Sequence, residues 1–198
     1  INNHSYVKSF FIFCALFFFL VAPVAFLTPL QVIRSFGNDI WRLTAIEVVF
    51  SLGMAAGGGI MAAWQGFKNK VHTMILSIFA FGVFTFALGV IPNFLIYLFF
   101  MGLLGIALPV FSTPSTVLLQ QKVEENFMGR VFGVYVMISS SMMPLGMLLF
   151  GPFADTILIE WMLIGTGLLL TIVGFLMIMS KELIKAGEPV PESIIPSE

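Results

Sequence analysis

Long apolar stretches separated by short polar connectors dominate this chain of 198 residues. Six of them are long enough to cross the hydrocarbon core of a bilayer, about 30 Å thick, as helices of about 20 residues. Their bounds lie near 9–33, 42–64, 73–91, 94–119, 131–153 and 161–179. Because a bilayer offers no water to backbone polar groups, such stretches must form helices that satisfy their own hydrogen bonds. The sequence therefore predicts an all-α membrane protein with six transmembrane helices.

The composition also indicates a protein embedded in lipid. Hydrophobic residues make up 59% of the chain and charged residues 10%, against roughly 25% charged residues in an ordinary soluble domain. The net charge is −1 and the nine basic residues are scattered, so nucleic acid is not an expected partner. Cys14 is the single cysteine, and the lack of a Cys/His cluster predicts neither a metal nor a cofactor.

Charge and the start of the chain predict how it threads the membrane. Residue 1 is isoleucine and no signal-peptide pattern follows, so we expect a fragment or one half of a longer protein. With the N-terminus in the cytoplasm, only Arg34 and Arg42 fall on the outer side. The inner side then holds Lys8, Lys68, Lys70, Lys122, Arg130, Lys181 and Lys185. This positive-inside bias predicts a plasma-membrane protein with both ends in the cytoplasm.

Two regions follow from this pattern. Residues 1–180 are expected to form the transmembrane bundle. Residues 181–198 contain three prolines, mixed charge and little to bury, so we expect a disordered cytoplasmic tail.

Prolines divide the six spans into two triplets. Pro23 and Pro29 interrupt the first span, and Pro109 and Pro114 interrupt the fourth. The two spans therefore cross in opposite directions, as in an inverted 3+3 repeat. Each proline frees a backbone carbonyl that must lie beside protein or a water-filled cavity. We expect the first and fourth spans to line a cavity and the third and sixth to be lipid-facing or peripheral. The alternative is that the prolines only curve helices for packing.

Glu47 is the one carboxylate well inside a predicted span. An ionisable group at such depth is costly and marks a functional site by default. Apolar surroundings would favour its protonated form near neutral pH, as a proton-coupled carrier requires. We assign Glu47 to coupling or gating. The alternative is a shallow Glu47 that pairs with Arg42 or Arg34 at the membrane surface.

Uncharged polar residues and glycines accompany the prolines. The candidates for the substrate cavity are Thr28, Gln31, Ser51, Ser112, Ser115, Thr116 and Ser140. Hydroxyls and amides suit a weakly polar, largely apolar ligand, although each could instead bond its own helix or a neighbour. The glycines Gly53, Gly57, Gly58 and Gly146 predict close helix contacts, which could break and reform as a carrier rocks.

Three motifs in the fifth span make a family resemblance specific. They are Gly-Arg-Val-Phe-Gly-Val at 129–134, Pro-Leu-Gly-Met at 144–147 and Phe-Gly-Pro-Phe-Ala-Asp at 150–155. This region resembles the eleventh helix of major facilitator superfamily transporters, above all the branch of bacterial drug, macrolide and siderophore exporters. The likeness covers essentially all six spans, which would correspond to helices seven to twelve. It implies an absent N-terminal six-helix half as the partner.

The family also carries a cytoplasmic loop of glycine, acidic and basic residues after the second helix of a half. Gly59, Gly66, Lys68 and Lys70 match this pattern, but Ala63 stands in place of the acid. The resemblance therefore implies that the usual gating ion pair is incomplete, and Lys68 and Lys70 remain gating or topology residues. Arg130 could form a latch with Glu124 or Glu125, although an exposed pair contributes little.

These observations together predict a secondary active transporter. By resemblance it exports a small amphipathic compound, a drug, macrolide or siderophore, driven by protons through alternating access. An intramembrane enzyme is disfavoured because both histidines lie at span ends and no paired intramembrane aspartates occur. A six-helix scaffold, a self-assembling protein or a channel remains the alternative, although no selectivity segment is visible.

Overall fold

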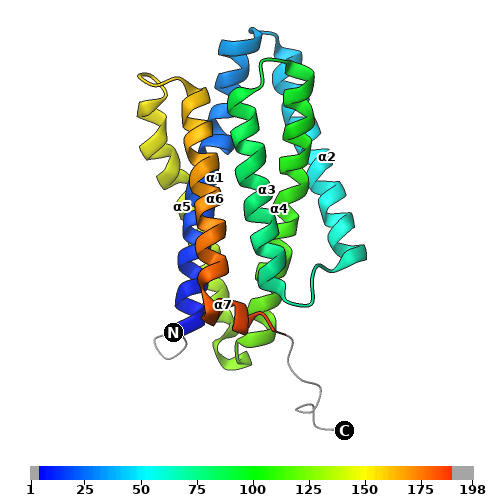
Figure 1. Cartoon of the computed structure of the whole chain (residues 1–198), viewed down its shortest axis with the longest axis vertical. Helices are drawn as coiled ribbons and strands as arrows, with labels where there is room; N and C mark the ends of the chain where they lie inside the picture. Colours follow the sequence, from blue (N-terminus) through cyan, green and yellow to red (C-terminus); the bar gives the residue numbers. More distant parts are fainter. Residues whose placement is uncertain (1–4, 189–198) are drawn as a thin grey trace.

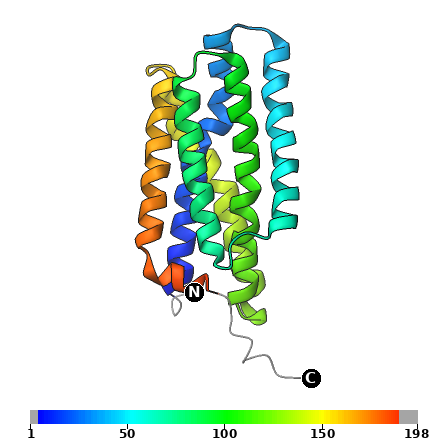
Figure 2. The same cartoon turned by 45° about the vertical axis from the view of Figure 1, so that its right-hand side comes forward.

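A computed structural model describes residues 5–188, and over this range the chain forms seven α-helices. They are α1 (Ser5–Phe36), α2 (Ile40–Trp64), α3 (Lys70–Val90), α4 (Phe94–Lys122), α5 (Glu125–Phe153), α6 (Ile159–Met179) and α7 (Lys181–Ala186). The first six stand side by side as an up-and-down bundle (Figures 1 and 2). All six are long and apolar enough to cross a membrane. The predicted all-α, six-span membrane protein is confirmed.

Helix contacts follow the predicted division into triplets. The pairs α1·α5 and α2·α4 are both in contact, and so are α1·α6 and α3·α4. If each helix is replaced by its counterpart in the other triplet, three places along the chain, the pair α1·α5 becomes α4·α2. In the same way, the pair α1·α6 becomes α4·α3. Because α1 and α4 run in opposite directions (Figure 1), this exchange inverts the chain across the membrane, as an inverted repeat requires.

The prolines do not interrupt their helices, contrary to the expectation. Pro23 and Pro29 lie inside the continuous helix α1, and Pro109 and Pro114 lie inside α4. Each proline lacks only the N–H that would bond the carbonyl four residues earlier. Neighbouring helices and hydroxyl groups tolerate such single losses within a bundle.

Within the described bundle, the third helix of each triplet is more buried than the second. In α3 the apolar window is 56% buried and in α6 it is 44%, against 22% in α2 and 17% in α5. Gly82 and Gly167 allow α3 and α6 to approach, since a Cβ on Gly82 would lie 3.0 Å from the Gly167 carbonyl oxygen. Thus α3 and α6 are packed in the bundle, whereas α2 and α5 have the most open faces.

Aromatic side chains fill the centre of the bundle. Phe17 of α1 stacks on Phe111 of α4 with ring centroids 3.8 Å apart, and meets Phe81 of α3 edge-on at 5.1 Å. All three are almost fully buried. Such pairs contribute about 0.5–1.5 kcal/mol each beyond burial, so these rings hold α1, α3 and α4 together.

The segment after the sixth span is partly helical rather than disordered. Residues 181–186 form α7, which packs Leu183 fully into the protein. The Asn69 side chain donates to the Ile184 carbonyl at 2.8 Å and fixes α7 to the loop before α3. The apolar pair Leu183 and Ile184 explains the difference, because it gives this segment something to bury. Residues 189–198 of the predicted tail lie outside the described residues.

Candidate functional site

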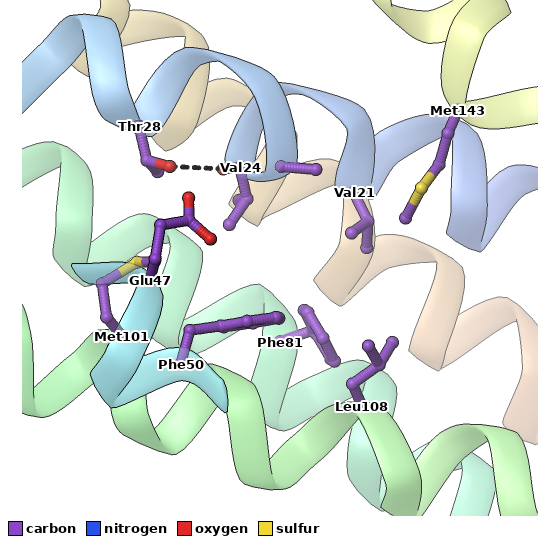
Figure 3. A pocket seen from close by; sticks show the side chains of 10 residues that line it. Val21, Val24, Thr28, Glu47, Phe50, Phe81, Met101, Leu108 and Met143 are labelled. Atoms are coloured by element: carbon purple, nitrogen blue, oxygen red, sulfur yellow. Dashed lines mark hydrogen bonds between the residues drawn. The ribbon is translucent and has the colours of Figure 1, made fainter. Parts of the chain in front are cut away.

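A pocket of about 160 Å³ opens between five of the spans (Figure 3). Its wall is mostly apolar and contains a single ionisable side chain, that of Glu47. The lining residues are Val21, Val24, Ala25, Thr28, Glu47, Phe50, Phe81, Met101, Leu108 and Met143. Helices from both triplets therefore contribute to one cavity inside the bundle.

Glu47 points from α2 across the pocket toward α1, close to Val24 and Thr28 (Figure 3). Among the described residues its carboxylate has no hydrogen-bond or ion-pair partner. The two arginines that could neutralise it are engaged elsewhere. Arg42 pairs with Asp39 at 3.2 Å, and Arg34 donates to the Ala154 carbonyl at 2.7 Å. The alternative of an arginine pair at the membrane surface is therefore not formed in this structure.

Glu47 is exposed on the open side of the pocket. The sequence argument for a proton-binding carboxylate relied on apolar surroundings on every side. The described chain supplies only one apolar wall, from Val24, Phe50 and Met101. The described residues thus leave one side of this carboxylate open.

Thr28 lies beside a backbone defect in α1. Its hydroxyl donates to the Val24 carbonyl at 2.8 Å, so it is satisfied within its own helix. Pro29 has no N–H for the Ala25 carbonyl, and Ala25 also lines the pocket. This part of the pocket wall therefore combines a carboxylate, a hydroxyl and a carbonyl without its helical donor.

Gln31 does not line the pocket, although it was a predicted cavity residue. It is buried, and its Nε2 donates to the Leu88 carbonyl at 3.0 Å. Its Oε1 accepts from the Tyr97 hydroxyl at 2.9 Å. The amide thus ties α1 to both α3 and α4, which is a packing role.

The other hydroxyl candidates also lie outside this pocket. Ser115 is fully buried and donates to the Phe111 carbonyl at 2.7 Å, and Thr116 donates to the Ser112 carbonyl at 3.0 Å. These are bonds within α4, as the alternative interpretation proposed. Ser51 and Ser140 are exposed. Residue type alone therefore does not decide which hydroxyl groups line this pocket.

Two of the four candidate glycines hold α2 against α4. A Cβ on Gly53 would collide with the Gly102 carbonyl oxygen, and one on Gly57 would lie 2.5 Å from that of Ile106. Gly58 has open space on its side, so it does not take part in this contact. Gly146 instead packs α5 against α1, where an added Cβ would lie 2.5 Å from the Ala22 Cβ.

The basic gating candidates lie at one end of the bundle. Lys70 donates to the Gln65 carbonyl at 2.9 Å across the loop before α3. Lys68 and Arg130 are exposed, and neither has an ion-pair partner in the described part of the chain. A latch between Arg130 and Glu124 or Glu125 is therefore not formed here.

Sequence reasoning missed the apolar wall of the pocket. Val21, Val24, Ala25 and Thr28 recur at i, i+3, i+4 and i+7, the spacing of one helix face. That stripe was the available signal for α1. Phe and Met were too abundant across the chain to point to Phe50, Met101 or Met143.

No family model matches the chain. The chain is similar to curated proteins. Macrolide efflux protein A of Streptococcus pyogenes is 29% identical to it over 160 residues, which are 79% of this chain. Its counterpart in Enterococcus faecalis is 28% identical over 134 residues, 67% of this chain. The matches cover 40% and 42% of these relatives, so the chain spans about two fifths of their length. With six apolar spans, this similarity confirms the resemblance to one half of an efflux transporter of the major facilitator type.

Proposed function

We propose that the chain forms one half of a secondary active transporter that exports a small amphipathic compound across the cytoplasmic membrane. The observation that carries this proposal is the unpaired Glu47 carboxylate in an apolar pocket between five spans. Carboxylates at membrane depth mark substrate or proton pathways in transporters. The similarity to macrolide efflux proteins supports export as the direction and a macrolide-like compound as the substrate.

The size of the pocket supports a site shared between two halves. It holds about 160 Å³, whereas sites for drug-sized ligands span about 300–1,000 Å³. The most open faces of the bundle belong to α2 and α5. A second six-helix half on these faces would supply the missing wall and enclose Glu47. The substrate would then bind near the membrane midplane between the halves.

Glu47 is the coupling residue in this proposal. Closure of the pocket by the partner half would shield the Glu47 carboxyl from water, and opening would expose it again, as alternating access requires. Rocking of the two halves would alternate these states. Lys68 and Arg130, at the basic end, are available to bind acidic groups of the partner half as the cytoplasmic side closes.

The proposed orientation places that basic end in the cytoplasm. The start of α1, the α2–α3 and α4–α5 connections and α7 all lie at one end of the bundle (Figure 1). Seven of the nine basic residues belong to this end, and Arg34 and Arg42 to the other. Such an asymmetry is typical of cytoplasmic segments.

An accumulation assay tests the proposal. Cells with and without the intact gene are loaded with a labelled macrolide at two external pH values, with and without a protonophore. We expect lower accumulation in cells with the gene and loss of this difference with the protonophore. Equal accumulation in both strains, with the protein present in the membrane, would refute macrolide export.

The alternative is a six-helix protein that assembles with itself. Gly58 and Gly59 of α2 have open space above them, and a small-residue face of this kind can accept another helix. Cross-linking of cysteine variants at these positions distinguishes the two. Links to a second copy favour self-assembly, whereas links to a separate six-helix half favour the transporter.

A further inference from the structure

A second hollow lies far from Glu47, at the basic end of the bundle. It holds about 370 Å³ between α3, α6 and α7 and is lined by His72, Ile75, Leu76, Phe79, Ile178 and Ile184. The four α3 residues recur at i, i+3, i+4 and i+7, so they form one stripe along the helix. Apart from His72, which stands at the basic end of this stripe, the lining is apolar.

The short helix α7 lies over the end of this groove and is held in a fixed rotation. Leu183 is fully buried beneath it, and the Ile184 carbonyl accepts from Asn69 at 2.8 Å. Ile184 itself lines the groove. The face of α7 that carries Ile184 is therefore the face turned toward the groove.

Helical spacing places two lysines on the same side of α7. At about 100° per residue, Lys181 lies roughly 60° from Ile184 around the helix and Lys185 roughly 100°. Glu182 lies roughly 160° from Ile184, beyond Lys185 and away from the groove. Lys181 and Lys185 are exposed, and among the described residues neither has an ion-pair partner. The groove thus has an apolar floor with His72 in its lining, and the adjoining helix α7 carries two exposed lysines.

We propose that this groove binds an anionic phospholipid of the cytoplasmic leaflet. One acyl chain lies along Ile75, Leu76 and Phe79, and the phosphate is held by Lys181 and Lys185 with His72 as a hydrogen-bond donor. Two features of the site select this ligand: apolar depth for a chain and unpaired cations at the membrane surface. A free phosphate would use only the lysines and His72, and a neutral lipid only the floor.

A lipid bound in this groove would also affect how the helices are held together. A lipid held in this way would join α3, α6 and α7 at the end where the chain leaves the bundle. The site is separate from the Glu47 pocket, so lipid binding can be tested without any assumption about transport.

Tryptophan quenching tests the proposal directly. The intact protein carrying Leu76→Trp is placed in nanodiscs with brominated phosphatidylglycerol or brominated phosphatidylcholine, and the signal of the three native tryptophans is subtracted with the parent protein. We expect at least threefold stronger apparent binding of the brominated anionic lipid at this position. Equal quenching by both lipids would overturn the proposal.

Charge variants separate the two lysines from general attraction to the membrane. The double variant Lys181→Gln/Lys185→Gln removes two charges at the groove, and Lys68→Gln/Arg130→Gln removes two at the same end outside it. Only the first is expected to abolish the preference for the anionic lipid. An equal loss in both would show a non-specific charge effect and contradict the site.

Native mass spectrometry provides a readout that does not depend on the tryptophan variant. The unmodified protein is expected to retain one phosphatidylglycerol after mild detergent exchange, and the Lys181→Gln/Lys185→Gln protein to lose it. Retention of the lipid by both proteins would contradict the proposal.

Discussion

Gly146 of α5 lies directly against Phe19 of α1, so that a Cβ on Gly146 would come within 2.8 Å of the Phe19 carbonyl oxygen. That carbonyl is the one that Pro23 leaves without its helical donor. The close approach covers an exposed backbone acceptor with protein, as a membrane interior demands. Pro23 in the first triplet and Gly146 in the second therefore act together: the proline leaves a carbonyl unpaired and the glycine lets α5 cover it.

This contact predicts a difference between two glycines of α5. Gly146→Ala should destabilise the protein by about 1–3 kcal/mol, since the added methyl forces the helices apart. Gly151 has nothing within 4 Å of its added Cβ, so Gly151→Ala should cost less than about 0.5 kcal/mol. Unfolding of both variants in mixed micelles measures the difference. Equal stability of the two would show that α5 does not pack on α1 in this way.

The buried amide of Gln31 predicts a second pair of variants. Tyr97→Phe removes the hydroxyl that donates to Gln31 Oε1 at 2.9 Å and leaves that buried oxygen without this donor, at a cost of about 1–3 kcal/mol. Thr85 has a buried hydroxyl without a hydrogen-bond partner, so Thr85→Val should be neutral or stabilising. Thermal unfolding in detergent compares them. A neutral Tyr97→Phe would remove Gln31 from the packing of α1, α3 and α4.

Much of the fold was predictable because lipid restricts the possibilities. The six spans follow from hydropathy, and the triplets follow from the spacing of Pro23 and Pro109. The polar residues were harder, because residue type does not give the direction of a side chain. Gln31 and Thr28 are one turn apart on α1, yet only Thr28 lines the pocket. Gln31 is held by its partners on α3 and α4, whereas Thr28 bonds within α1. The contacts of Gln31 are set by packing between helices.

Helix α7 is a segment whose structure could not be predicted from its own residues. Prolines at the end of the chain suggested disorder, but two apolar residues between Lys181 and Lys185 were enough to dock one turn of helix. Such a short segment gains its order from the surface that it covers, here the loop carrying Asn69. That surface exists only once the bundle has formed.

The glycines of α2 predict which helix contacts a moving carrier needs. Gly53 meets the backbone of α4 whereas Gly58 meets nothing, so Gly53→Ala should separate the helices and Gly58→Ala should not. We expect Gly53→Ala to cost about 1–3 kcal/mol in stability and, if the intact protein exports a macrolide as proposed, to lower that export. Measuring both quantities separates a motional from a packing role. Parental export and stability in Gly53→Ala would contradict the α2–α4 contact.

Glu47 provides the sharpest prediction about mechanism. Glu47→Gln keeps the shape of the side chain but removes the exchangeable proton and the negative charge. If the carboxylate couples protons to export, Glu47→Gln should abolish the proton-driven part of export, because no other ionisable side chain lines the pocket. Any remaining export should no longer respond to external pH. Everted vesicles of the intact protein with an imposed proton gradient measure both effects.

The matched control is Glu125→Gln, which removes an exposed carboxylate at the first turn of α5. It should leave the rate and its pH response unchanged, because this residue lies at the basic end and outside the pocket. Parental proton-driven export by Glu47→Gln would remove Glu47 from coupling. A loss of export that kept its pH response would instead assign the carboxylate to substrate binding, since binding and proton transfer would then depend on different groups.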